Sequence, residues 1–113
     1  MLALAHDVRV MRSDRGYFCL PEVDLGLSFS DGFAAIIDAK LEQPALHRLA
    51  VLGERLAAPT GVDLGFIDAA VEEDEVLAAA IARATRLAPK ASPTIAALRK
   101  NFYGEAIERL TAR

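Results

Sequence analysis

One carboxylate stands in an otherwise apolar stretch of this sequence, where it could do proton-transfer chemistry. Glu22 follows Pro21 within "YFCLPEVDLGLSFSDGFAAII", residues 17–37. A buried carboxylate is costly unless it is paired or neutral, so the residue is either satisfied by the fold or kept for chemistry. In the first case Glu22 is a strand-end residue bonded to nearby backbone N–H groups; in the second it is an acid or base.

A second acid, Asp24, lies two residues beyond Glu22. On an extended segment the two side chains would point to the same side, where they could interact. The alternative, which we favour, is that Asp24 is solvated or caps a neighbouring turn. The two histidines, His6 and His47, have no partner at ligand spacing, so we expect no metal site. The single cysteine, Cys19, rules out an internal disulfide and fits a core position in a reducing compartment.

The totals suit one small domain, or part of a larger one. The chain has 113 residues, of which 53% are apolar, and a net charge of -3. The basic residues are scattered, so we expect no nucleic-acid partner. No apolar run approaches the roughly 18 residues that span a bilayer, so we expect no membrane partner. The opening residues lack the pattern of a signal peptide and read as the end of a helix.

The hydrophobic pattern predicts two or three short strands followed by mostly helices. Residues 8–12 alternate in polarity, residues 17–20 are wholly apolar up to Pro21, and residues 66–71 are rich in aromatic and apolar types. The predicted helices cover residues 32–40, 44–54, 72–88 and 93 onward, with a short helical turn over 58–65. A sheet of so few strands cannot close over itself, so the helical tail needs a partner surface.

Three motifs in order carry a family resemblance. They are Ala3 to Asp7 with Arg9, then Pro21-Glu22 with Gly26, then "TGVDLGFIDAAV" from Thr60. In this combination the chain resembles the C-terminal half of the enoyl-CoA hydratase/isomerase family, also called the crotonase superfamily. The resemblance implies an α/β fold, a spiral of ββα units. It assigns residues 1–70 to the C-terminal part of the core and residues 71–113 to a helical oligomerisation region. It also implies a trimer or hexamer when complete.

The resemblance also implies a chemistry. Family members stabilise the enolate of an acyl-CoA thioester with two backbone N–H groups, while carboxylates move protons. Glu22 matches the family acid/base, and apolar surroundings would make its carboxylate a stronger base. The neighbours expected to bind substrate are Leu20, Pro21, Leu27 and Phe29. No cofactor is implied, because coenzyme A is part of the substrate.

The departures from the family pattern favour one reaction over another. Family hydratases carry a second glutamate six residues ahead of the strand aspartate, and here that position is Met1. One carboxylate is enough to move a double bond, so the sequence favours a Δ3,Δ2-enoyl-CoA isomerase of fatty acid β-oxidation. A hydratase is the alternative.

The resemblance places both oxyanion-hole donors ahead of Met1, so we expect the chain alone to be a truncated and inactive half. The rival function is a non-catalytic module that binds a full-length paralogue through its helices. A chance match of an unrelated small α+β domain is a third possibility. We expect a location in bacterial cytoplasm, with a peroxisome or another organelle as the alternative.

Overall fold

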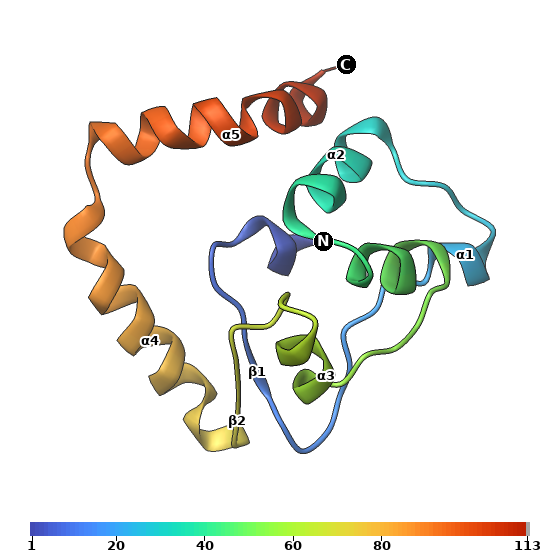
Figure 1. Ribbon diagram of the computed structural model, residues 1–113, viewed down its shortest axis with the longest axis horizontal. Helices are drawn as coiled ribbons and strands as arrows, with labels where there is room; N and C mark the ends of the chain where they lie inside the picture. The colour runs from blue at the N-terminus through green and yellow to red at the C-terminus, as the bar shows by residue number, and fades with distance from the viewer. Residues whose placement is uncertain (113) are drawn as a thin grey trace.

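Short helices and a two-stranded sheet follow one another along residues 1–112, the part of the chain that the computed structural model describes (Figure 1). The fold is mixed α/β and mostly helical, as the sequence predicted. In order, the elements are the 3-10 turn η1 (Leu2–Ala5), β1 (Val10–Arg12), α1 (Glu22–Leu25), α2 (Asp31–Lys40), the π-helix η2 (His47–Val51), α3 (Ala58–Asp63), β2 (Ala69–Val71), the 3-10 turn η3 (Glu73–Glu75), α4 (Val76–Leu87), the 3-10 turn η4 (Ala88–Lys90) and α5 (Pro93–Thr111).

The sheet pairs β1 with β2 in parallel, with Met11 opposite Ala70. Both strands lie inside segments that the sequence predicted as extended. Each strand is shorter than predicted. The first residues of the 66–71 segment lie in the core and not in the strand. Phe66 and Ile67 are almost fully buried in the core ahead of the strand. A short apolar run is therefore shared here between core packing and strand pairing.

The prediction of a strand at residues 17–20 is wrong. Only Phe18 forms a bridge there, antiparallel to Leu56, with its N–H 2.8 Å from the Leu56 carbonyl oxygen. The apolar side chains pack instead of pairing: Leu20 is buried, and the Phe18 ring lies edge-on to Phe66 with centroids 5.3 Å apart. A short apolar run does not by its periodicity distinguish a strand from irregular core chain. Cys19 is half-buried rather than part of the core.

The helix predicted at residues 32–40 is confirmed as α2, and Ser30 caps it. The Ser30 hydroxyl accepts a hydrogen bond from the backbone N–H of Phe33 at 3.3 Å, which satisfies one free donor of the first turn. The helix predicted at 44–54 is shorter and contains the π-helix η2. It ends before Gly53, whose φ of 64° is left-handed. Leu49 in η2 is fully buried, and His47 is exposed as predicted.

The core lies where η1, α2 and η2 meet the loops around α3. Its buried members come from segments far apart in the sequence, so burying them fixes the chain path. They are Leu4, Leu20, Ile37, Leu41, Ala45, Leu49, Leu56, Phe66 and Ile67.

The last two helices form an arm along the outside of this core (Figure 1). Neither α4 nor α5 contains a buried residue. Their large apolar side chains lie mostly in solvent, since Leu77 is 71% exposed and Phe102 75% exposed. The arm packs on the core mainly through α5 against α2, where a Cβ on Gly32 of α2 would lie 2.8 Å from the Leu110 Cα of α5. The division into residues 1–70 and 71–113 stays a prediction.

No helix within residues 1–112 combines the length and the apolar character needed to cross a bilayer.

Candidate active site

Glu22 lies in the single-turn helix α1, and this corrects the extended geometry expected for the segment. Pro21 begins the turn, and its carbonyl accepts from the Asp24 N–H at 3.0 Å. Gly26, with a φ of 69°, ends it, and the Leu27 N–H returns to the Glu22 carbonyl at 2.9 Å. Residues two apart on a helix do not face each other, so Asp24 does not share a side with Glu22. Asp24 is exposed, as favoured from the sequence.

The Glu22 carboxylate has one buried oxygen without a partner. Within residues 1–112, Oε2 is shielded from solvent and has no hydrogen-bond partner. Buried polar atoms in folded proteins are almost always hydrogen-bonded, so each exception calls for an explanation. The structural alternative given above, in which the Glu22 carboxylate is bonded to nearby backbone N–H groups, does not account for this oxygen. Among the described residues, the fold therefore leaves this oxygen with unused hydrogen-bonding capacity.

The turn that carries Glu22 rests on Gly53, just beyond η2. A Cβ on Gly53 would lie 2.7 Å from the Val23 Cγ1 and 3.3 Å from the Asp24 Oδ2. Only glycine combines this close approach with a left-handed φ at low cost. Gly53 falls inside the helix predicted at residues 44–54, and sequence reasoning did not identify this role. The sequence feature that could have indicated this role is a glycine directly after an apolar helical run.

The four residues predicted to bind substrate differ in their burial. Leu20 is buried in the core, and Phe29 is half-buried and packs against the core. Pro21 and Leu27 are exposed, Leu27 by 61%. The role of all four stays a prediction. Sequence reasoning did not single out two other exposed apolar residues of this turn, Val23 and Leu25.

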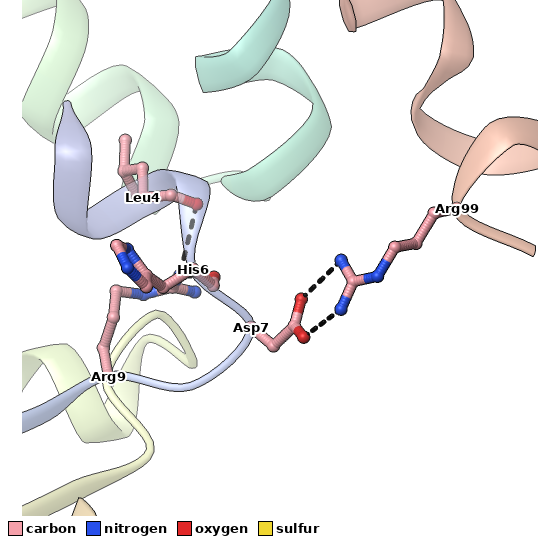
Figure 2. Close-up of polar contacts among 5 residues, drawn as sticks. All are labelled: Leu4, His6, Asp7, Arg9 and Arg99. Atoms are coloured by element: carbon pink, nitrogen blue, oxygen red, sulfur yellow. Dashed lines mark hydrogen bonds and ion pairs between the residues drawn. The ribbon is translucent and has the colours of Figure 1, made fainter. Parts of the chain in front are cut away.

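Arg9 ties the end of η1, beside which it lies in Figure 2, to the chain ahead of β2. Its Nε donates to the Phe66 carbonyl at 2.7 Å and its Nη1 to the His6 carbonyl at 2.8 Å. Its backbone N–H donates to the Asp68 Oδ2 at 2.8 Å. One guanidinium thus satisfies carbonyls from two separate loops. Arg9 belongs to the motif that carried the family resemblance, but the sequence assigned it no role.

Asp7 and Arg99 join the loop after η1 to the arm (Figure 2). The Arg99 guanidinium donates to both Asp7 oxygens, with Nη1 3.0 Å from Oδ1. These hydrogen bonds hold the pKa of the Asp7 carboxyl below its usual value, against the opposing effect of partial burial. The arm is therefore held on the core partly by a bidentate ion pair at its surface.

No group of three or more histidine, cysteine, aspartate or glutamate residues in the described part of the chain could hold a metal ion.

Known proteins resemble this chain in both sequence and fold. The sequence model of the family described as enoyl-CoA hydratase/isomerase matches residues 1–113. The chain is 37% identical over 110 residues to the peroxisomal enoyl-CoA delta isomerase 2 of Arabidopsis thaliana, covering 93% of this chain and 46% of that one. A carnitinyl-CoA dehydratase of Mycobacterium avium superposes with a TM-score of 0.74 at 37% identity, over 91% of this chain and 40% of that one.

An enoyl-CoA hydratase of Mycobacterium marinum superposes more closely, with a TM-score of 0.83 over 96% of this chain and 48% of that one. At 22% identity it is a likeness of fold alone. The fold is thus that of the crotonase superfamily, as predicted. The chain belongs to the enoyl-CoA hydratase/isomerase family. It spans about half the length of the curated relatives it matches.

Proposed function

We propose that this chain supplies the acid/base half of an active site that converts a 3-enoyl-CoA into a 2-enoyl-CoA. The observation that carries the proposal is the buried Oε2 of Glu22, which has no partner within residues 1–112. A carboxylate oxygen that is shielded from water and free of hydrogen bonds is available to a carbon-bound proton, which water would otherwise outcompete.

The reaction needs a single proton carrier. Glu22 takes a proton from C2 of the substrate, and the electrons of that bond become the new C2=C3 double bond. The electrons of the former C3=C4 double bond take the same proton at C4. Nothing is oxidised, reduced or released, so the reaction needs no cofactor beyond the coenzyme A of the substrate. The charge that develops on the thioester oxygen needs hydrogen-bond donors, which the family resemblance places outside this chain.

Two observations favour an isomerase over a hydratase. Curated relatives at 36% and 37% identity are named enoyl-CoA delta isomerases. At the position where the family hydratases carry their second glutamate, this chain has Met1, which packs against the core and cannot activate water. A hydratase remains the alternative from the same family.

The test uses a chimera, because the chain spans 46% of the Arabidopsis isomerase. The chain replaces the matching segment of that protein, and conversion of 3-hexenoyl-CoA is followed by the absorbance of the conjugated product. We expect Glu22→Gln to lower kcat by about 10²–10⁴-fold, the usual contribution of a general acid/base. Asp24→Asn is the matched control and should leave kcat within about threefold, since Asp24 is exposed.

A Glu22→Gln chimera as fast as its parent would overturn the assignment of Glu22. The pure 113-residue chain should show no conversion, since the loss of even one oxyanion-hole donor costs about 10²–10³ in rate. Measurable turnover by the chain alone would show that it is not an incomplete site.

A second function is favoured by the exposed surface. The accessible area is 7737 Å², against about 6000 Å² expected for a compact monomer of 12.1 kDa. Such an excess suits a module that binds a full-length homologue or further copies of itself. Co-migration with a full-length homologue in size-exclusion chromatography would support this function, and separate peaks would count against it.

The compartment is also a proposal. We propose the bacterial cytoplasm, although two of the curated relatives are named as peroxisomal.

A further inference from the structure

A small apolar pocket lies between α2 and α5, apart from Glu22. Its cavity volume is about 140 Å³. An enclosed apolar cavity of about 150 Å³ holds a molecule of the size of benzene, and this pocket has a similar volume but is open to solvent. The pocket is thus large enough for one ring or a short alkyl chain. The lining residues are Ala5, Ile36, Ala39, Lys40, Arg99, Tyr103, Ala106, Ile107 and Leu110.

The lining combines an apolar wall with two cations, Lys40 and Arg99. The Arg99 charge is balanced by the bidentate pair with Asp7. The Lys40 charge is not balanced in this way, because Lys40 takes part in none of the ion pairs found within residues 1–112. The cluster of Asp7, Lys40 and Arg99 therefore carries a net positive charge beside an apolar cavity.

Lys40 is held in place by an aromatic ring. Its ammonium nitrogen lies 4.4 Å from the centroid of the Tyr103 ring, within the range of a cation–π interaction. Lys40 is half-buried, so its charge is less screened than that of a freely solvated lysine. An ammonium keeps three donors, and the face of a ring does not use them as an oxygen acceptor would. A carboxylate at this place would satisfy both the charge and the donors.

We propose that this pocket binds a small monocarboxylate with an apolar body of about benzene size, such as hexanoate. The carboxylate pairs with the Lys40 ammonium beside Arg99, and the alkyl chain lies against Ile36 and Ile107. This site is independent of Glu22 and of the proposed isomerisation.

The test is a titration of the full 113-residue chain, labelled with ¹⁵N, with sodium hexanoate and followed by NMR. We expect saturable shifts confined to residues around the pocket and a Kd on the order of 1 mM, reasonable for a ligand of about eight heavy atoms. Acetate has the charge without the tail, and 1-hexanol has the tail without the charge. Each should bind at least about fivefold more weakly, since charge-assisted hydrogen bonds and apolar burial both contribute.

Variants separate the charge from the cavity. Lys40→Gln should weaken hexanoate about fivefold and leave 1-hexanol unchanged, while Lys100→Gln on the exposed side of α5 is the matched control. Ala106→Leu should fill the cavity and weaken both ligands. Equal affinity for hexanoate and 1-hexanol would overturn the proposal, as would non-saturable shifts spread over all lysines and arginines. An unchanged hexanoate affinity in Lys40→Gln would also overturn it, and that surface substitution leaves the core intact.

Discussion

At the scale of single residues, Glu22 and Arg9 differ in whether the fold provides hydrogen-bond partners for their polar atoms. The Glu22 Oε2 is buried without a partner among the described residues, whereas Arg9 donates to carbonyls of two separate loops. An unsatisfied buried atom lowers stability, and a satisfied one contributes to it. This difference is consistent with the proposed proton-transfer role of Glu22, whereas the contacts of Arg9 are those of a structural residue.

Replacing Arg9 should destabilise the chain more than a surface substitution. Arg9→Leu leaves the Phe66 and His6 carbonyls without their donor, which we expect to lower the free energy of unfolding by about 2–3 kcal/mol. Urea unfolding followed by circular dichroism measures the change. Arg15→Leu, at an exposed position of the turn after β1, is the control and should change stability by less than about 0.5 kcal/mol. Equal effects of the two substitutions would show that the Arg9 hydrogen bonds are not important.

At the scale of elements, the position of the Glu22 turn is set by its contact with the end of η2. The helix α1 is only one turn long and has no buried residue. Such a short helix is not stable by itself, so its geometry depends on what it packs against. The close approach of Gly53 to Val23 is that support.

A methyl group at Gly53 should displace this turn. Gly53→Ala combines a left-handed φ with a Cβ 2.7 Å from the Val23 Cγ1, and we expect a loss of about 2–4 kcal/mol. Gly65→Ala is a matched control, because Gly65 has a φ of 84° but open space around its Cβ. It should cost only the conformational penalty, about 1–2 kcal/mol. Thermal unfolding compares them, and a smaller loss for Gly53→Ala would refute the packing argument.

The ion pair between Asp7 and Arg99 should make the arm sensitive to acid. The pKa of Asp7 is lowered in the folded chain by its hydrogen bonds from Arg99, so its contribution is present above the unfolded value of 3.8 and is lost as pH falls through the folded value. Both side chains are more than a third exposed, so we expect at most about 1 kcal/mol.

The measurement for this ion pair is the pH dependence of unfolding, with Asp7→Asn beside the parent chain. The parent should lose its advantage over Asp7→Asn below about pH 4, and the two curves should meet in stronger acid. Curves that stay parallel down to pH 2 would show that the pair contributes nothing. Asp14, whose pKa Arg12 lowers to about 2, titrates in both proteins and cancels in the difference.

At the scale of the whole molecule, the chain is less compact than its length allows. The Cα radius of gyration is 15.2 Å, against about 13 Å for a compact domain of this length. The arm of α4 and α5 lies along the outside of the core (Figure 1), and its largest apolar side chain, Phe102, is 75% exposed. A second surface would bury these side chains, and they contribute little to the stability of the chain by itself.

Two truncations should therefore differ sharply. Leu49→Ala removes a fully buried side chain and should lower the free energy of unfolding by about 2–5 kcal/mol. Phe102→Ala removes a larger side chain that is 75% exposed and should cost less than about 0.5 kcal/mol. Chemical unfolding at micromolar concentration measures both. A large loss for Phe102→Ala would mean that the arm is buried in solution, for instance by self-association.

Much of this protein could be predicted from sequence because it depends on neighbours along the chain. The cap at Ser30 and the start of α5 at Pro93 follow from local backbone preferences. The three motifs that carried the family resemblance depend on spacing alone. What tertiary structure decided depends on contacts between distant segments. The apolar run at residues 17–20 forms a single bridge to Leu56 rather than a strand, and its Phe18 and Leu20 pack on the core, because Leu56 and Phe66 lie against it. The burial of the Glu22 Oε2 is a property of the folded chain, and no local pattern contains that information.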